Sequence, residues 1–270
     1  MSYKLTVLVE NNAPKDSELE AEHGLSVFVE TPNTAFLFDC GQTGMAWRNA
    51  ARLGIDLTRI EFVVLSHSHY DHAGGFPELL QYAKPTSLYV GHDFWQEKFS
   101  YDDVNGQYVY KGCGFQESDL RDWGISERMC ENTISLDNYA SIFTNFDSQY
   151  SFERIPQKFR RGKEKESDPF DDEICLLLPE KDGLALVVGC SHKGILNIVS
   201  TVKKRTGLPV HRIVGGIHLS KECHERIEMT IRELRLLGVK ELNLCHCSGA
   251  DVPGRIQTGT VIEISNICLL

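Results

Sequence analysis

The chain has 270 residues, of which 41% are hydrophobic, and a formal net charge of −10. This length suffices for one large globular domain or for a domain with an elaborate insertion. The acidic charge argues against a general affinity for nucleic acid, and no apolar stretch approaches the length of a membrane span.

The N-terminus and the cysteines bear on the cellular compartment. The first ten residues alternate like a strand and lack the charged head and long apolar segment of a signal peptide, so we expect a cytoplasmic protein. The nine cysteines are an odd number and are scattered along the chain. In a reducing compartment most of them are expected to be free thiols, buried as small hydrophobic side chains.

The first part of the chain predicts strands and a short helix. Three strands are expected over Lys4–Glu10, Leu25–Glu30 and Ala35–Phe38. The third ends at Asp39, just before a glycine turn. Met45–Leu53 is expected to form a helix that ends at Gly54.

The next segment carries the most informative pattern. The apolar run Phe62–Leu65 leads into three histidines and one aspartate, which are His67, His69, Asp71 and His72. An apolar run followed by a polar, glycine-containing turn predicts a buried strand that ends in a loop. Imidazole and carboxylate at this density suit Zn, Mn or Fe. The alternative, a polar surface loop that happens to be rich in histidine, requires four ligand-type residues to coincide at this spacing.

A helix from Pro77 to Tyr82 is expected next, with proline at its first turn. Residues from about 93 to 170 differ in character, because they mix aromatic residues with Gly, Asn and Asp and lack a long helical periodicity. We interpret them as an insertion of hairpins and loops over the site. A basic cluster lies near its end, formed by Arg154, Lys158, Arg160, Arg161 and Lys163. It either binds an anion or is a solvated charge run.

The last hundred residues alternate regularly. Strands are expected over Ile174–Leu178, Leu184–Val188, His211–Val214 and Glu241–Leu244. One helix has an apolar face at Ile195, Ile198, Val199 and Val202 and ends at Gly207. A second is expected to be capped by Ser220, with Ile227, Ile231 and Leu234 on one face, and to end at Gly238. Strands that alternate with helices predict a layered α/β structure.

Three of these later strands also stop at residues able to bind metal. Cys190 and His192 follow one strand, His218 follows the next, and Cys245-His246 follows the last. Strand ends hold loop residues in fixed positions, so active-site groups gather there. Four strand ends with ligand-type residues in one chain predict a single shared site.

The pattern resembles the metallo-β-lactamase-fold superfamily, whose HxHxDH signature matches residues 67–72. The resemblance implies a single domain over residues 1–270 with a four-layer αββα sandwich and the loop and hairpin insertion described above. It also implies a binuclear site at one edge, where Asp39 would support a metal ligand. The segments around Glu22-His23-Gly24, residues 189–192, 215–219 and 245–249 look like the subgroup named after dihydropterin-6-methyl-(ribofuranosyl)aminobenzene 5′-phosphate synthase.

The sequence departs from the usual superfamily pattern at two places. Cys190 stands where a metal-bridging aspartate is usual, and the usual histidine before Ile174–Leu178 is missing. His192 follows the same strand end as Cys190 and is a candidate replacement for that histidine.

The resemblance leads to a specific assignment of two divalent metal ions, with zinc favoured over manganese or iron. His67, His69 and His192 are assigned to one ion, and Asp71, His72 and His246 to the other. Cys190 is a ligand or a nearby thiol. Asp71 and His218 are the candidate catalytic residues, His218 as a phosphate contact or general acid. Candidate substrate-binding residues are His23, Lys193, Arg160 and Arg161.

The leading functional prediction is a binuclear metalloenzyme for an anionic small molecule that is phosphorylated or pterin-like. In a hydrolase, metal-activated hydroxide attacks a phosphate or carbonyl centre. In a synthase, the metals hold a pyrophosphate leaving group while an arylamine ribotide adds to the pterin methyl carbon. Two alternatives are a diiron redox module of the same fold, which typically carries Glu at the position of His69, and a non-catalytic metal- or ligand-binding sensor. Neither nucleic acid nor membrane is an expected partner, and the sequence leaves the oligomeric state open.

Overall fold

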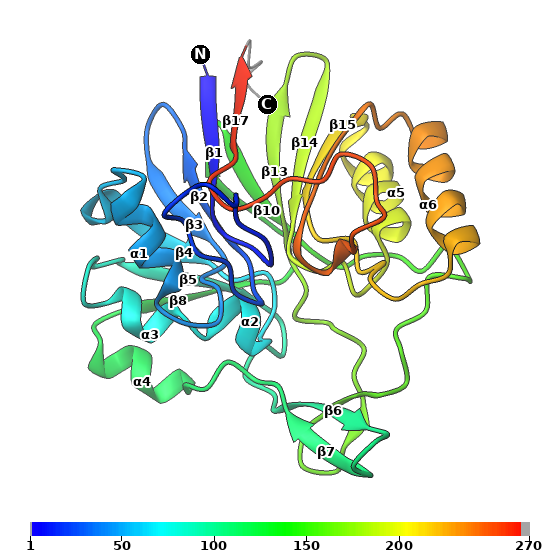
Figure 1. Cartoon of the computed structure of the whole chain (residues 1–270), viewed down its shortest axis with the longest axis horizontal. Coiled ribbons are helices and arrows are strands. Elements are labelled where there is room, and N and C mark those ends of the chain that lie inside the picture. The colour runs from blue at the N-terminus through cyan, green and yellow to red at the C-terminus, as the bar shows by residue number, and fades with distance from the viewer. Residues whose placement is uncertain (1, 266–270) are drawn as a thin grey trace.

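The computed structural model describes residues 2–265, so Met1 and residues 266–270 of the expected domain lie outside the described part. Two large mixed sheets face each other, and helices cover the outer face of each (Figure 1). The predicted fold class, an α/β four-layer αββα sandwich, is therefore confirmed.

The first large sheet is built from the N-terminal half and one C-terminal strand. Its strands, in spatial order, are β17 (Val261–Ser265), β1 (Ser2–Val9), β2 (Ser26–Glu30), β3 (Ala35–Phe38), β4 (Ile60–Val64), β5 (Ser87–Gly91) and β8 (Ser126–Cys130). From β3 to β8 the neighbouring strands run parallel. The outer face packs against α1 (Met45–Arg52), α3 (Phe76–Leu79) and α4 (Glu117–Asp122). Two further short helices, η1 (Leu57–Arg59) and α2 (Tyr70–Ala73), flank β4 in the chain.

The second large sheet holds most of the C-terminal half. Its strands, in spatial order, are β16 (Glu241–Leu244), β15 (Val210–Gly215), β14 (Gly183–Val188), β13 (Cys175–Glu180), β10 (Ala140–Phe143) and β9 (Thr133–Asp137). The strands β14, β15 and β16 are parallel. The helices α5 (Ile195–Thr206) and α6 (His224–Leu237) cover its outer face.

The alternation of apolar side chains in β14 explains why the layers stack in this way. Leu184, Leu186 and Val188 belong to the core under α5 and α6, whereas Ala185 and Val187 belong to the core between the two sheets. Successive strand residues point to opposite faces, so a strand that is apolar throughout must be covered on both sides. The core between the sheets also contains Phe36 and Val64 of the first sheet, and it joins the two halves.

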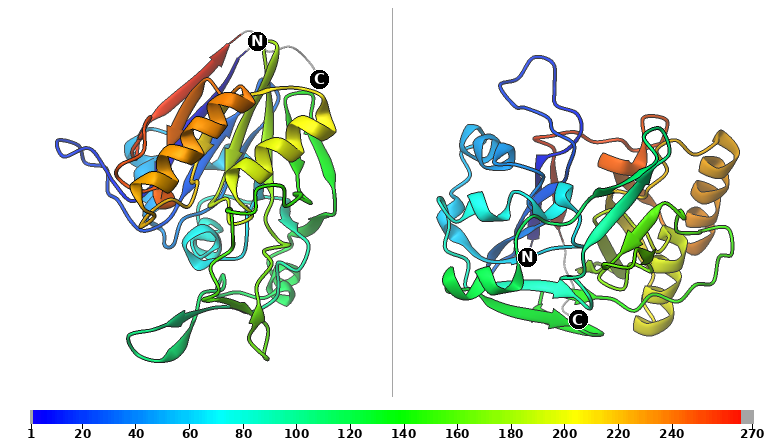
Figure 2. Two further views of the ribbon diagram at one scale, coloured as in Figure 1. Left: turned by 90° about the vertical axis from the view of Figure 1, so that its right-hand side faces the viewer. Right: turned by 90° about the horizontal axis from the view of Figure 1, so that it is seen from below.

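The segment expected as an insertion, residues 93–170, divides between three sheets. A separate four-stranded sheet of β12 (Glu166–Ser167), β11 (Phe159–Arg161), β6 (Lys98–Asp102) and β7 (Gln107–Tyr110) projects beyond one end of the sandwich (Figures 1 and 2). The strands β8, β9 and β10 instead belong to the two large sheets, so the added sheet is narrower than expected. Because β8 and β9 are sheet-edge strands with largely exposed or half-buried side chains, they lack the apolar signal of central strands.

Several expected helix ends are confirmed, and two details are wrong. The helices α5 and α6 end at Gly207 and Gly238, both in the left-handed conformation. The helix that contains Pro77 is a single turn. The α6 helix begins at His224 after Cys223, so Ser220 does not cap it; the Ser220 amide donates instead to the Cys247 carbonyl. Within residues 2–265, no helix has the length and apolar character that crossing a bilayer requires.

Candidate metal centre

The ligand-type residues converge because parallel strands of both sheets end at the same edge of the sandwich. The strand β4 leads to His67 and His69, and the α2 turn that follows supplies Asp71 and His72. In the second sheet, β14 leads to Cys190 and His192, β15 to His218, and β16 to His246. The carboxyl ends of parallel strands are the usual location of functional groups in α/β proteins.

One cluster consists of His67, His69 and His192. One ring nitrogen from each lies within 4.8 Å of the others. The Nε2 atoms of His67 and His69 and both ring nitrogens of His192 are buried and have no hydrogen-bond partner within the described part of the chain. Buried polar atoms without partners are costly, and a bound cation would satisfy them. This donor set therefore fits a metal ion.

A second cluster adjoins the first. Nε2 of His72 lies 3.1 Å from Nε2 of His246, and Oδ2 of Asp71 lies 3.4 Å from the latter atom and 4.0 Å from the former. Sγ of Cys190 lies 3.2 Å from Nε2 of His72. His67, His72 and Cys190 also form a group within 4.8 Å, so the two clusters share a boundary. The donor atoms sit close enough together to coordinate a second ion.

Asp39 and Ser66 hold His72 and His67 in place through contacts with the Nδ1 atoms of the two rings. As expected from the sequence, Asp39 contacts a candidate ligand: its Oδ2 lies 2.6 Å from Nδ1 of His72. Its two oxygens also accept hydrogen bonds from the Ser66 amide and hydroxyl, and that hydroxyl lies 2.9 Å from Nδ1 of His67. A Cβ at Gly189 would meet the Ser66 hydroxyl at 2.0 Å, so glycine is needed for the sheets to approach here. Such partners orient metal-binding imidazoles.

The residues that hold His246 could not be identified from the sequence. Oδ1 of Asn11 lies 2.9 Å from its Nδ1, and the carboxylate of Glu10 accepts a hydrogen bond from its amide at 3.0 Å. Both residues come from the end of β1, which is more than 230 positions away in sequence. No local signal in the sequence indicates this pairing.

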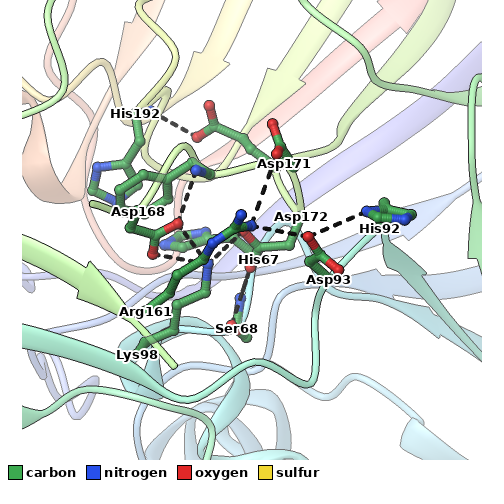
Figure 3. Close-up of polar contacts among 12 residues, drawn as sticks. His67, Ser68, His92, Asp93, Lys98, Arg161, Asp168, Asp171, Asp172 and His192 are labelled. Atoms are coloured by element: carbon green, nitrogen blue, oxygen red, sulfur yellow. Dashed lines mark hydrogen bonds and ion pairs between the residues drawn. The ribbon is translucent and has the colours of Figure 1, made fainter. Parts of the chain in front are cut away.

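A buried charge network, also missed, supports the loop between His67 and His69 (Figure 3). Nζ of Lys98 lies 2.8 Å from Asp172 and 3.1 Å from Asp168, and its side chain is 1% exposed. Asp172 in turn accepts hydrogen bonds from the amide and hydroxyl of Ser68. The neighbouring Glu173 accepts from the amide of His192 at 2.6 Å. The added sheet is thus linked to the metal-binding loop through Lys98 and Asp172.

The protonation states of four candidate ligand histidines also suit metal binding. Burial lowers the pKa of His69 to about 3 and that of His246 to about 4. Burial, followed by neighbouring imidazoles, holds the pKa of His67 and of His192 well below the usual range. Neutral imidazole is the form that coordinates a metal. For Asp71, burial opposes ionisation, but hydrogen bonds from His23 and His246 outweigh it and keep its pKa well below the usual range.

A cavity of about 340 Å³ opens onto both clusters. His218 lines it, with its ring centroid 4.6 Å from that of His192. It belongs to none of the ligand groups found among residues 2–265. His23 lines the cavity as well, and its Nε2 lies 3.1 Å from Asp71.

The other candidate substrate-binding residues lie outside the lining of this cavity. Lys193 is ion-paired with Asp171 at 2.7 Å. Arg161 pairs with Asp93 at 2.9 Å (Figure 3), and Arg160 donates to the Ser167 hydroxyl. Their contact with a substrate stays a prediction. A substrate that binds to them would have to replace these ion pairs and this hydrogen bond, or share the same donor groups.

Three other lysines do line the cavity: Lys111, Lys158 and Lys221. None has a carboxylate within ion-pair distance in the described residues, although the chain carries a net charge of −10. Of these, only Lys158 belongs to the basic cluster noted from the sequence. Lys111 follows β7 and Lys221 follows His218 in an irregular loop, where isolated lysines give no local signal.

The chain is similar to known proteins in both sequence and structure. The sequence model of the Metallo-beta-lactamase superfamily matches residues 19–124. A 7,8-dihydropterin-6-methyl-4-(beta-D-ribofuranosyl)-aminobenzene-5′-phosphate synthase from Methanocaldococcus jannaschii is 29% identical over 263 residues, which cover 91% of this chain and 87% of the synthase.

Solved structures show the same fold. Tm1679, described as a metal-dependent hydrolase of the β-lactamase superfamily, superposes with a TM-score of 0.81 and 26% identity, covering 98% of this chain and all of that one. The short form of human tRNase Z shares the fold, with a TM-score of 0.55 and 15% identity over 97% of this chain and all of that one. The matched motif segment, the full-length likeness to Tm1679 and the αββα architecture together show that the chain has the metallo-β-lactamase fold.

Proposed function

We propose that this protein is a binuclear metal-dependent enzyme that acts on a phosphorylated or pterin-like small molecule. The observation that carries the proposal is the meeting of two adjoining ligand clusters around one cavity with three lysines that have no ion-pair partner within residues 2–265. Its volume of about 340 Å³ falls in the range of small-molecule sites.

His67, His69 and His192 would hold the first ion, and Asp71, His72 and His246, with Cys190 beside them, the second. Two such ions, zinc by preference or else manganese or iron, would lower the pKa of a water molecule and polarise a substrate oxygen. The candidate ligand side chains of both clusters are buried, and several of them line the cavity.

The wall of the cavity supports an anionic substrate that contains a flat ring. Lys111, Lys158 and Lys221 supply ammonium groups that can bind phosphate as point charges. Two of them lie over aromatic rings of the same wall: Lys111 is 4.9 Å from the ring centroid of Tyr70, and Lys158 is 5.0 Å from that of Phe159. These rings can stack on a flat heterocycle such as a pterin.

His218 is placed to bind the substrate from the mouth of the site. Burial, followed by the charge of Lys158, lowers its pKa to about 4, so the imidazole is neutral at neutral pH. A neutral ring can still donate one N–H hydrogen bond, which suits a phosphate or a developing oxyanion better than proton transfer from an imidazolium.

Hydrolase and synthase remain the two versions of this proposal. The Methanocaldococcus relative is named as a synthase, whereas Tm1679 is described as a hydrolase. In the synthase version, the lysines would hold the pyrophosphate that leaves as an arylamine adds to the pterin methyl carbon. In the hydrolytic version, they would hold the phosphate of an ester or of a carbonyl substrate while water attacks.

Metal analysis and a substrate screen test the proposal together. Protein purified without oxygen should contain between one and two equivalents of Zn, Mn or Fe. The screen should include phosphoesters, thioesters, lactones, and pterin pyrophosphate with an arylamine ribotide. The double variant His67→Ala/His69→Ala should lose turnover and keep its fold. Active protein with almost no metal would refute the proposal.

The cytoplasm remains the proposed location. The eight cysteines of residues 2–265 are all free, and seven of them are buried or half-buried, as expected in a reducing compartment.

A further inference from the structure

The candidate metal centre contains a second cysteine, Cys247, to which the sequence analysis gave no role. Its Sγ, the Sγ of Cys190 and a ring nitrogen of His246 all lie within 4.8 Å of one another. Cys190 and Cys247 both line the cavity, yet they come from the ends of different strands, β14 and β16. Two thiols and an imidazole at this separation form a donor set for a metal ion.

The backbone after β16 is bent so that consecutive side chains reach the same cavity. Cys245 still points into the core between the sheets. His246 then adopts a left-handed φ of 51°, and a short 3-10 turn, η2 (His246–Ser248), follows. The turn is fixed on both sides, because the Ser220 amide donates to the Cys247 carbonyl and the Ile217 amide donates to the Ser248 hydroxyl. As a result, both His246 and Cys247 line the cavity.

The neighbouring strand end leaves space for the Cys247 sulfur. A Cβ at Gly216 would lie 2.6 Å from Sγ of Cys247 and 2.4 Å from the carbonyl oxygen of Gly189. Any side chain at Gly216 would therefore expel the sulfur or separate β14 from β15. The position of Cys247 depends on this glycine, in the same way that the Asp39–Ser66 contact depends on Gly189.

We propose that Cys190 and Cys247 bind one metal ion together, as thiolates, beside His246. This inference rests on the proposed metal-dependent function and deepens it, because it makes the two sites chemically different. The first site has only imidazole donors, whereas the second has two sulfur donors. Binding releases the two thiol protons to solvent, and the metal takes their place. Thiolates select zinc or iron over manganese or magnesium, so the second site would discriminate more strongly between ions.

Cobalt(II) is the probe, because sulfur ligation produces an intense ligand-to-metal charge-transfer absorption that imidazole ligation lacks. Metal-free full-length protein is titrated with cobalt(II) without oxygen, and the near-ultraviolet band is recorded. Cys190→Ser and Cys247→Ser should each remove about half of its intensity, and the double variant should remove it, if each thiolate contributes equally. The visible bands of cobalt at the histidine site should persist. Cys223→Ser is the matched control, since Cys223 is exposed and belongs to none of the ligand groups of residues 2–265.

X-ray absorption of the zinc-loaded protein gives a second, independent readout. The wild type should show a sulfur shell near the usual Zn–S distance of about 2.3 Å, and this shell should diminish in Cys247→Ser. If that variant does not fold, alkylation of the wild-type protein with and without zinc tests the inference. Bound zinc should slow the reaction of iodoacetamide with Cys190 and Cys247 about tenfold or more, and it should leave the reaction of Cys223 unaffected.

Each remaining outcome overturns the inference in an identifiable way. An unchanged charge-transfer band in Cys247→Ser, or a disulfide between the two cysteines in the oxygen-free protein, would show that they do not act as a ligand pair. Cobalt binding with no charge-transfer band would exclude sulfur ligation and leave the proposed enzyme intact. No cobalt binding would refute both.

Discussion

Oδ2 of Asp39 lies 2.6 Å from Nδ1 of His72, and both side chains are completely buried. Burial would lower the pKa of His72, but the carboxylates of Asp39 and Asp71 outweigh it and raise the pKa to about 9. The contact fixes the ring so that Nε2 faces Asp71, Cys190 and His246. Asp39 thus orients His72 of the second cluster. Through Ser66 it also anchors the loop that carries His67 of the first cluster.

Asp39→Asn should weaken metal binding without unfolding the protein. Asparagine keeps the shape of the side chain but loses the negative charge that aligns and polarises His72. Loss of such a supporting carboxylate typically costs about 10- to 100-fold in metal affinity. Competition with a chromophoric chelator measures the change. Asp102→Asn, at the last residue of β6 in the added sheet, is the control and should leave the affinity unaltered. Unchanged affinity in Asp39→Asn would show that the contact does not support the ligand.

Lys98→Met should destabilise the fold strongly. It leaves the buried carboxylates of Asp168 and Asp172 without their cation, and breaking a buried ion pair in this way costs about 3–5 kcal/mol. Burial raises the pKa of Asp168 even with Lys98 present. Without Lys98, the folded-state pKa of Asp168 would rise further above the unfolded value. The loss of stability should then be full near neutral pH and shrink as pH falls and Asp168 takes up a proton.

Urea denaturation of the Lys98→Met variant between pH 5 and 8 measures this effect. Lys111→Met is the matched control, because Lys111 is half-buried near the same added sheet but has no carboxylate partner among residues 2–265. A cost of less than 1 kcal/mol for Lys98→Met would mean that the network contributes little to stability.

Local patterns in the sequence predicted most of the fold and the centre of the site. Strands β3 and β16 have the expected bounds, and the apolar face of α5 packs against the second sheet as expected. These features depend on short-range periodicity, which one sequence displays. The ligand-type residues could be recognised because each follows an apolar strand.

Long-range pairing explains what the sequence could not show. In the sequence, Lys98 cannot be distinguished from other charged strand residues. Its partner Asp172 lies 74 positions away, and only the folded chain brings the two together. The basic cluster of residues 154–163 was expected near the substrate, but only Lys158 of that cluster lines the cavity. Which of several adjacent basic side chains lines a cavity depends on where the fold places the segment around β11, and composition carries no such information.

Without metal, the protein should lose stability as pH falls below neutrality. The folded-state pKa values of His69, His218 and His246 are lowered to about 3, 4 and 4. In the unfolded chain these residues take up protons near pH 6.5, so the unfolded state binds more protons below that pH and the free energy of unfolding falls. Each such histidine contributes about 1.4 kcal/mol per pH unit.

The groups with a raised pKa do not reverse this trend. Burial raises the pKa of Glu173 to about 7, which opposes the trend between about pH 4.5 and 7, and burial also raises the pKa of Asp168 and of Glu153. The lowered pKa values of His67 and His192 add to the trend and offset these contributions. His72, with its raised pKa, is protonated in both states below pH 6.5 and adds no slope there. Urea denaturation in a chelating buffer at pH 4.5–6.5 should therefore show stability rising with pH. A flat or opposite profile would contradict the protonation states given for the buried histidines.

Lys158→Gln should weaken substrate binding more than it slows turnover. Lys158 lines the cavity and has no carboxylate partner in the described part of the chain, so its charge is available to an anionic substrate. Loss of such a contact should raise KM about tenfold and change kcat little, because it acts on substrate and transition state alike. Lys163→Gln is the control, since Lys163 is exposed in the same segment and lies outside the lining of the cavity. Equal effects in both variants would indicate that the overall positive charge of the segment matters and that Lys158 makes no specific contact with the substrate.

His218→Ala should keep full metal content and lose activity about a hundredfold or more, the range expected for a positioned hydrogen-bond donor at the reacting group. His218 stands apart from the ligand groups of residues 2–265 but lines the cavity against His192. Elemental analysis and steady-state kinetics of the same preparation separate the possibilities. Loss of one metal equivalent would make His218 a ligand and would change the coordination set proposed above. Full activity would assign it a packing role against Phe159 and His192.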